Sequence, residues 1–551
     1  MDFADKVIYQ LYPKSFYDSN GDGIGDLRGI IAKLDYLKSL HVDMIWFNPF
    51  FVSPQNDNGY DIADYRRIDP RFGTMADFDE LVYKLHAAGI DVMLDMVLNH
   101  TSTAHPWFQK ALAGDEKYQA YYYLRDPKPN GDLPTNWESK FGGNAWAPFG
   151  DTGKYYLHLY DKTQADLDWH NPAVRREAAD IVNFWRGKGV RGFRFDVLNV
   201  IGKDEELRDA PAGVESKTLY TDTPVVQTYI QELAAASFGR GDGSITVGEM
   251  SSTKLPNAIA YTNPVNDELS MVFQFHHLKT DYENGNKWTR ARYDFPYLRQ
   301  LLHEWGEGMS AGAGWQALFW NNHDQPRALN RFGEVTHYRV RSAQVLAASI
   351  HLSRGTPYIY MGEEIGMSDP EYRSMTDYVD IESHNAYAEL LASGKSAAEA
   401  FTIVHAKSRD NSRTPMQWDS SQNAGFTTGT PWLKPTNQDL VNVHDELAHG
   451  RIFNFYQHLI TLRKRYAVIA RGDYQAFGTA TDWLYAYQRR LGKEGLLVLN
   501  NFADHDISFT IPDDWCGGKV IIDNVPGFQL KPDITLPAFS TVAIYRNDLK
   551  E

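Results

Sequence analysis

Eight short apolar runs, separated by amphipathic stretches, constrain the fold of this chain more than any other feature of its sequence. Three of the intervening stretches, residues 75–88, 172–188 and 339–353, have the apolar spacing of helices. Strands that alternate with helices form parallel sheets, and repeated units of this kind close into a barrel. We therefore predict an α/β fold, a (β/α)8 TIM barrel. Its predicted strands are residues 7–12, 44–47, 91–97, 192–195, 245–247, 271–275, 317–320 and 356–361.

Two regions do not follow this alternation. The interval between the third and fourth predicted strands is rich in Gly, Pro, Asn and aromatic residues and is too long for an ordinary barrel connection. After about residue 471, short alternating stretches typical of antiparallel strands appear, at 483–488, 495–500, 507–511 and 541–545. We predict a catalytic barrel (residues 1–100 and 172–470), an inserted subdomain after strand three (101–171) and a C-terminal antiparallel β-sandwich domain (471–551).

Charge and composition limit the partners of this chain. Its 551 residues carry a formal net charge of -16, and an acidic surface disfavours nonspecific binding to nucleic acid or anionic membranes. The N-terminal residues lack a basic segment followed by an apolar one, and no window reaches the length of a membrane-spanning helix. Cys516 is the only cysteine, which suits a reducing compartment. We predict a cytoplasmic monomer with no nucleic-acid or membrane partner.

Polar side chains stand at the ends of four predicted strands. Asp95-Met-Val-Leu-Asn-His100 lies at the end of strand three, Arg194-Phe-Asp196 at the end of strand four, and Glu249 follows strand five; Asn322-His323-Asp324 follows strand seven. Catalytic residues of barrels occupy this end of the strands. Since side chains alternate along a strand, Arg194 and Asp196 point to the same side, and we expect the arginine to lower the pKa of Asp196.

Paired carboxyl groups of this kind suit the cleavage of a glycosidic bond. One carboxyl group must protonate the leaving oxygen, while another attacks or shields the anomeric carbon. Asp196 and Glu249 can meet this demand, and we expect Asp324 to raise the pKa of Glu249 by charge repulsion. His100 and His323 would add donors for sugar hydroxyls. Each residue alone has an ordinary structural explanation, and the prediction therefore depends on their joint occurrence.

The motifs Asp95-Met-Val-Leu-Asn-His100, Gly192-Phe-Arg-Phe-Asp196, Gly248-Glu-Met250 and Asn321-Asn-His-Asp324 resemble the four signature regions of the alpha-amylase family. The resemblance covers essentially the whole chain. It implies a (β/α)8 barrel with an inserted domain and a C-terminal β-sandwich. It also implies a retaining mechanism with Asp196 as nucleophile, Glu249 as acid/base and Asp324 as stabiliser. Noncatalytic transporter subunits with amylase-like ectodomains are the rival class, but those usually lose the acids that this chain keeps.

Further segments resemble the oligo-1,6-glucosidase branch of that family. These are Asn58-Gly-Tyr-Asp61 and the stretch from Ser408 to Trp418. The resemblance implies that Tyr60, Asp61 and Arg413 close a pocket around a terminal glucose, which makes the enzyme exo-acting. Gln164-Ala-Asp-Leu-Asp168 resembles an additional motif of the branch, with Asp where Asn is usual. Val197 resembles members that do not prefer alpha-1,4 links.

Three segments resemble trehalose-6-phosphate hydrolases more than other members of the branch. They are Glu249-Met-Ser-Ser-Thr253, Phe275-His-His-Leu-Lys279 and Asn286-Lys-Trp288. The resemblance implies a phosphorylated leaving group, for which His277, Lys279 and Lys287 are candidate cations. Ordinary surface lysines and a packed histidine are the alternative interpretation. The second candidate function is an oligo-1,6-glucosidase, and a transglycosylating isomerase is a third.

One loop resembles a metal site. Asp18, Asn20, Asp22 and Asp26 carry side-chain oxygens at alternate positions, and Ile24 could offer its carbonyl, as in the first part of an EF-hand loop. The twelfth position is Gly29 rather than a glutamate, so the loop departs from a true EF-hand and resembles the structural calcium loop of the branch. We expect Ca²⁺, with Mg²⁺ as an alternative; a metal-free turn rich in Gly and Asp stays possible. No organic cofactor is expected.

Overall fold

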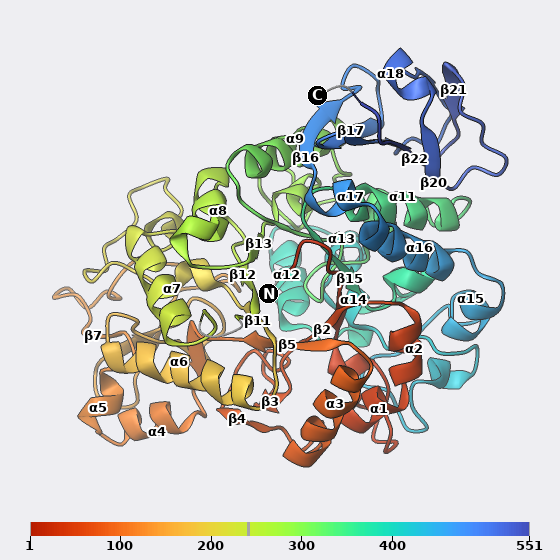
Figure 1. Cartoon of the computed structure of the whole chain (residues 1–551). Helices are drawn as coiled ribbons and strands as arrows, with labels where there is room; N and C mark the ends of the chain where they lie inside the picture. The colour runs from red at the N-terminus through yellow and green to blue at the C-terminus, as the bar shows by residue number, and fades with distance from the viewer. Residues whose placement is uncertain (1, 240–242, 550–551) are drawn as a thin grey trace. The chain divides into compact units, whose positions relative to one another are not determined.

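The computed structural model describes residues 2–239 and 243–549 (Figure 1). Eight parallel strands form one nearly closed sheet in the order β13-β12-β11-β5-β2-β1-β15-β14. Each overlaps one of the eight predicted runs, so the predicted barrel is confirmed. The strands are β1 (Ile8–Leu11), β2 (Met44–Phe47), β5 (Asp91–Met96), β11 (Gly192–Phe195), β12 (Ile245–Glu249), β13 (Met271–Phe273), β14 (Ala317–Leu318) and β15 (Thr356–Tyr360).

The chain divides into two compact units, which are described separately: the first is Trp46–Gln274, and the second combines Asp2–Ile45 with residues from 275 onward. In the first unit, β11 pairs in parallel with both β5 and β12. Helices α3 (Met75–Ala87) and α6 (Pro172–Gly187) match two predicted helices. Thr74 and Asp77 form a capping box at the start of α3, and Asn171 caps α6, so local side chains fix where both helices begin.

The long interval between β5 and β11 contains its own small elements. Strand β6 (His100–Ser102) pairs with β10 (Gln164–Asp166), and β7 (Leu124–Arg125), β9 (Tyr155–Leu157) and β8 (Trp146–Pro148) form a three-stranded antiparallel sheet. Tyr123, Trp137 and Trp146 form an aromatic core, which Val197 and Val200 join from the turn after β11. The aromatic residues of this segment therefore pack against the turn that follows β11.

In the second unit, β1 pairs with β15, which pairs with β14. The helices of this unit include α9 (Phe295–Ala311), α11 (Arg339–His351), α12 (Ile381–Ala392), α13 (Ala397–Lys407) and α14 (Asp410–Arg413). Helix α11 is buried along most of its length, and its bounds match the third predicted helix. No helix within residues 2–239 and 243–549 combines the length and the apolar character needed to cross a membrane.

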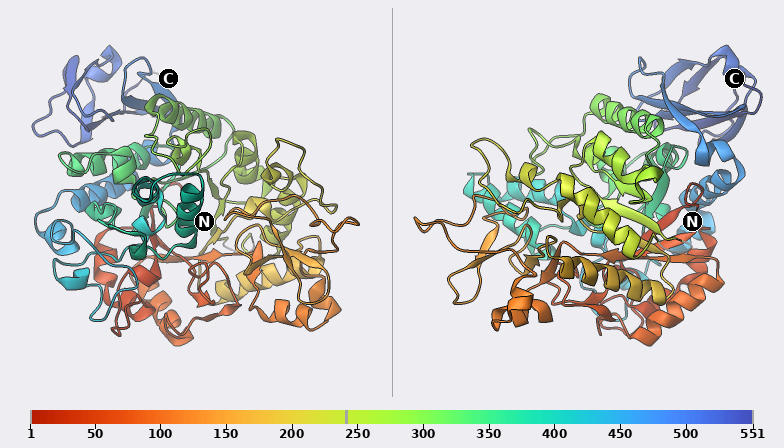
Figure 2. Two further views of the ribbon diagram at one scale, coloured as in Figure 1. Left: turned by 180° about the vertical axis from the view of Figure 1, so that it is seen from behind. Right: turned by 60° about the vertical axis from the view of Figure 1, so that its left-hand side comes forward.

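The C-terminal residues form two antiparallel sheets that share one apolar core, seen as the blue strands in Figure 2. The predicted strands correspond to β17 (Leu484–Leu491), β18 (Glu494–Asn501), β19 (Ile507–Thr510) and β22 (Thr541–Arg546). Three further strands escaped prediction: β16 (Asp473–Phe477), β20 (Lys519–Asp523) and β21 (Asp533–Leu536).

Candidate active site

Arg194 is the centre of a carboxylate cluster in the first unit. Its Nη1 lies 2.7 Å from Asp95 Oδ1 and 2.6 Å from Asp196 Oδ1, and its Nη2 lies 2.6 Å from Glu249 Oε2. The arginine side chain is 1% exposed, so these charge-assisted contacts are shielded from water. One planar guanidinium thus fixes the predicted nucleophile and the predicted acid/base on its two terminal nitrogens.

Strand pairing explains why these side chains meet. Arg194 lies opposite Asp95 of β5, and β12 ends at Glu249. Directly after Asp196, Val197 adopts a left-handed backbone with φ of 39°, which is strained for a β-branched residue. This turn places the backbone N–H of Val197 3.3 Å from Glu249 Oε2. The strained turn and the carboxyl group are therefore in direct contact.

The protonation of Asp196 differs from the sequence prediction. Burial raises the pKa of Asp196 to about 6, and Arg194 and a hydrogen bond with Glu249 offset this only in part. The pKa of Asp95 is raised by the same cause. The expectation that Arg194 gives Asp196 a lowered pKa is therefore wrong in its net direction, because one guanidinium shared among three carboxyl groups compensates each of them incompletely.

Tyr60 connects the cluster to the predicted sugar-binding residues of the same unit. Its hydroxyl donates to Asp95 Oδ2 (2.9 Å) and accepts from Asn48 Nδ2 (2.8 Å). His100 Nε2 lies 3.1 Å from the Tyr60 carbonyl and 3.2 Å from Gln164 Nε2. Burial lowers the pKa of His100 to about 4, so its ring is neutral at pH 7. Tyr60, His100 and Gln164 thus form one buried polar group.

The two aspartates near Tyr60 have different surroundings. Asp61 is fully buried, and its carboxylate accepts from Ser53 Oγ (2.9 Å) and from the backbone N–H groups of Asn56 and Asp57. Asp57, which the sequence reasoning did not single out, accepts from Gln164 Nε2 at 3.1 Å. The carboxylate of Asp61 therefore stabilises the loop from Ser53 to Asp61. Asp57 is an additional candidate for sugar binding. Its position in the Asp57-Asn-Gly-Tyr60 turn is the signal that could have revealed it.

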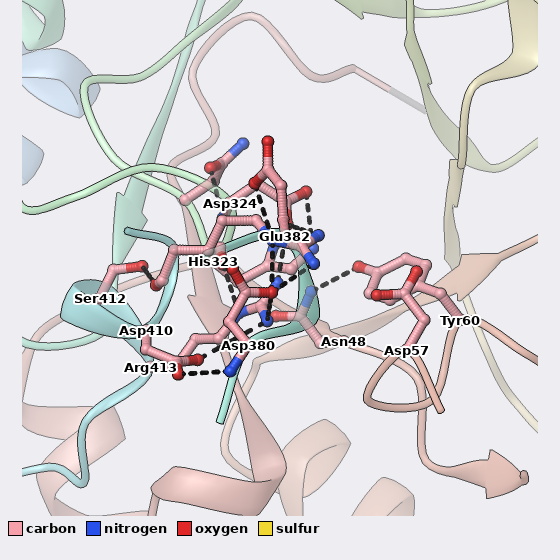
Figure 3. Close-up of polar contacts among 12 residues, drawn as sticks. Asn48, Asp57, Tyr60, His323, Asp324, Asp380, Glu382, Asp410, Ser412 and Arg413 are labelled. Atoms are coloured by element: carbon pink, nitrogen blue, oxygen red, sulfur yellow. Dashed lines mark hydrogen bonds and ion pairs between the residues drawn. The ribbon is translucent and has the colours of Figure 1, made fainter. Parts of the chain in front are cut away.

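The second unit contains Asp324, His323 and Arg413 (Figure 3). Arg413 Nη2 lies 2.9 Å from Asp324 Oδ1, and its Nη1 lies 3.8 Å from Asp380 Oδ1. Arg409 reaches the same two carboxylates, at 3.3 Å and 2.6 Å. His323 Nδ1 lies 3.0 Å from Gln10 Nε2, which orients the ring. Asp324, the predicted stabiliser, is therefore held by two arginines.

Two of the three predicted phosphate contacts carry a positive charge. Lys287 Nζ lies 2.8 Å from Glu382 Oε2 and 4.6 Å from the centre of the Trp288 ring, and Lys279 is half-buried at the end of a short helical turn, η5 (His276–Lys279). His277 is buried, and its Nε2 lies 2.8 Å from the Phe319 carbonyl. Burial lowers the pKa of His277 to about 3, so the expectation of a cationic His277 is wrong.

The predicted metal loop offers oxygens only. Gly23 has a φ of 91° and would place a Cβ 1.9 Å from the Thr430 carbonyl, so this turn requires glycine. Asp18 and Asp26 accept backbone N–H groups of Gly21 and Gly29, whereas Asn20 and Asp22 are exposed. Over residues 2–239 and 243–549, no group of three or more His, Cys, Asp or Glu side chains is placed to hold a metal ion. A cation here would also need the Asn20 amide and the Ile24 carbonyl, a donor set that fits Ca²⁺.

Two carboxyl groups at the ends of neighbouring barrel strands, held by one arginine, are typical of a glycoside hydrolase of the barrel type. The chain belongs to the alpha-amylase family. The model of the alpha amylase catalytic domain matches residues 10–472, and the model of the alpha-amylase SusG C-terminal domain matches residues 484–543.

Relatives share nearly the full length of the chain. A trehalose-6-phosphate hydrolase of Bacillus subtilis is 47% identical, over 98% of this chain and 97% of its own length. An oligo-1,6-glucosidase of Parageobacillus thermoglucosidasius is 46% identical, over 93% and 92%. The solved structure of Bacillus licheniformis trehalose-6-phosphate hydrolase superposes with a TM-score of 0.95 and 48% identity, covering 99% of this chain and 100% of the other.

Proposed function

We propose that this chain is a retaining, exo-acting alpha-glucosidase that hydrolyses trehalose 6-phosphate to glucose and glucose 6-phosphate. The observation that carries the catalytic part is the contact of one buried guanidinium, that of Arg194, with both Asp196 and Glu249. The substrate assignment is supported by the names of relatives 47% and 49% identical to this chain. The enzyme is proposed to act as a cytoplasmic monomer, without an organic cofactor.

The proposed reaction has two displacements. Asp196 attacks the anomeric carbon of the unphosphorylated glucose while Glu249 donates a proton to the bridging oxygen, which releases glucose 6-phosphate. Glu249 then removes a proton from water as the water oxygen attacks the anomeric carbon, which breaks the bond to Asp196 and releases glucose and the free carboxylate. The carboxylate of Asp324 would stabilise the positive charge of the transition state. Tyr60, His100, Gln164 and Arg413 would hold the terminal glucose, together with Asp57.

The phosphate of the leaving group needs cations in a protein whose net charge is -16. Lys279 and Lys287 are proposed to provide them. Glu382, which now pairs with Lys287 at 2.8 Å, would have to share or release the ammonium group when a phosphate binds. The same ion pair favours the second candidate function, an oligo-1,6-glucosidase, because a neutral sugar could hydrogen-bond to both partners.

A structural calcium ion is proposed for the loop of Asp18, Asn20, Asp22, Ile24 and Asp26, supported by the oxygen-only donor set. Mg²⁺ is the alternative, though it demands stricter octahedral geometry. Ligand binding to the folded state raises its stability, so a chelator should lower the melting temperature by several degrees, with calcium restoring it. Asp22→Ala should remove this response. A melting temperature that is the same with and without chelator would contradict the proposal.

The reaction is tested by following trehalose 6-phosphate hydrolysis by proton NMR. We expect equimolar glucose and glucose 6-phosphate, with glucose appearing first as the alpha anomer before mutarotation. A first product of beta configuration would overturn the retaining mechanism. The absence of glucose 6-phosphate among the products would overturn the substrate.

A further inference from the structure

A buried ion cluster lies in the second unit, apart from the groups assigned to catalysis. The carboxylate of Asp281 accepts from Arg331 Nε (3.1 Å) and Nη2 (2.8 Å), and from Lys407 Nζ (2.6 Å). All three side chains are between 4% and 6% exposed. Burial opposes ionisation of Asp281, but Arg331 and Lys407 hold its pKa below the usual value. Two buried basic side chains thus hold one carboxylate.

Arg331 also holds two chain segments that carry proposed site residues. Its Nη2 donates to the Leu278 carbonyl, one residue before Lys279. Its Nη1 donates to Gln325 Oε1 at 2.8 Å, and Gln325 directly follows Asp324. A guanidinium is a planar fork whose donors have fixed relative directions, so these contacts set the two segments at a fixed separation.

We propose that Arg331 is a positioning residue that fixes the Lys279 segment relative to the Asp324 segment and thereby determines the preference for a phosphorylated leaving group. This inference rests on the proposed function, in which Lys279 contacts the phosphate. A phosphate dianion needs its cations at set positions. A neutral leaving group has no such requirement.

The test compares substrates with and without phosphate in an Arg331→Lys variant. Lysine retains the positive charge but cannot reach Asp281, Leu278 and Gln325 together. We expect KM for trehalose 6-phosphate to rise about tenfold, while kcat/KM for p-nitrophenyl alpha-glucoside changes less than about threefold. Arg341→Lys is the matched control. Arg341 is a half-buried arginine of α11 whose side chain donates to the Ala538 carbonyl at 3.4 Å, and the kinetics on both substrates should be unaffected.

An equal fall in kcat/KM for the two substrates, or unchanged kinetics with both, would overturn the inference. If Arg331→Lys does not fold, Lys407→Gln provides a second test. Lys407 is the second cation that anchors Asp281, the carboxylate on which Arg331 is held, so its loss should let the arginine shift. KM for trehalose 6-phosphate should then rise about threefold, and KM for the nitrophenyl substrate should not change; an unchanged KM for trehalose 6-phosphate overturns the inference. A wild-type enzyme that does not prefer trehalose 6-phosphate to trehalose would instead contradict the proposed function.

Discussion

The two arginine-centred clusters differ in how many cations serve their carboxylates. In the first, the one guanidinium of Arg194 contacts Asp95, Asp196 and Glu249. In the second, Asp324 and Asp380 each contact two guanidinium groups, those of Arg409 and Arg413. Arg409 also lies 3.3 Å from Glu382, and Arg413 lies 3.9 Å from Asp410.

The difference appears in the pKa values. Burial raises the pKa of Asp196 to about 6, whereas the paired arginines overcome burial and hold the pKa of Asp380 well below its usual range. Asp380, which contacts two arginines, therefore stays charged, whereas the pKa of Asp196, which shares one arginine with two other carboxyl groups, lies near neutral pH.

The largest expected effect follows from removing the nucleophile. Asp196→Ala should lower kcat by on the order of 10,000-fold or more, because it removes the carboxylate that forms the glucosyl intermediate in the proposed reaction. Circular dichroism and the melting temperature should show a folded protein. Substantial remaining hydrolysis with retained configuration would contradict the nucleophile assignment.

The clusters should also differ when an arginine is lost. Arg194→Met removes the guanidinium that contacts all three buried carboxyl groups and should reduce the free energy of unfolding by about 3–5 kcal/mol at pH 8. Arg409→Met leaves Arg413 beside Asp324 and should cost about 1–3 kcal/mol. Urea unfolding of both variants measures the difference. Equal losses would show that the number of cations does not distinguish the clusters.

The pH dependence of the rate tests the raised pKa of Asp196. A raised pKa means that the nucleophile binds its proton already near pH 6, so activity is present above this pH and lost as pH falls through it. The substrate should be p-nitrophenyl alpha-glucoside, which lacks a phosphate that titrates in the same range. We expect kcat/KM to fall about tenfold per pH unit well below 6. A rate that stays constant down to pH ~4.5 would contradict the raised pKa.

The smallest expected effect concerns binding of the leaving group. Lys287→Ala should raise KM for trehalose 6-phosphate by about tenfold and leave the nitrophenyl glucoside unaffected, since only the former carries a phosphate. Lys38→Ala, at an exposed lysine paired with Asp35, is the control. An equal rise in KM for both substrates would argue against a phosphate contact. It would favour a role for the Lys287–Glu382 pair in stabilising the site.

The barrel could be predicted because its strands are short runs made mostly of apolar residues, and four of them end next to polar or charged side chains. Strand β11, for example, has the predicted bounds of residues 192–195. Strand β21 could not be predicted, because its four residues alternate between exposed and buried over too short a length to show a period. The C-terminal sheets depend on pairing between distant segments, which a local pattern does not reveal.

The sequence was sufficient to predict which residues form the site, but not their protonation states or their hydrogen-bond partners. The signature motifs pointed to Asp196, Glu249 and Asp324. The raised pKa of Asp196 and the lowered pKa of His277 both depend on the degree of burial, so neither could be predicted from local sequence. Asp57 escaped notice because its partner, Gln164, is 107 residues distant.

The central claim is tested most directly by measuring kcat/KM for trehalose 6-phosphate, trehalose and isomaltose with one enzyme preparation. The account predicts that trehalose 6-phosphate exceeds the other two by at least about 100-fold, because sites built around a charged group discriminate strongly against substrates that lack it. The highest value for isomaltose would contradict it. The fold and the Arg194 cluster would then belong to an oligo-1,6-glucosidase, and Lys279 and Lys287 would have no phosphate to bind.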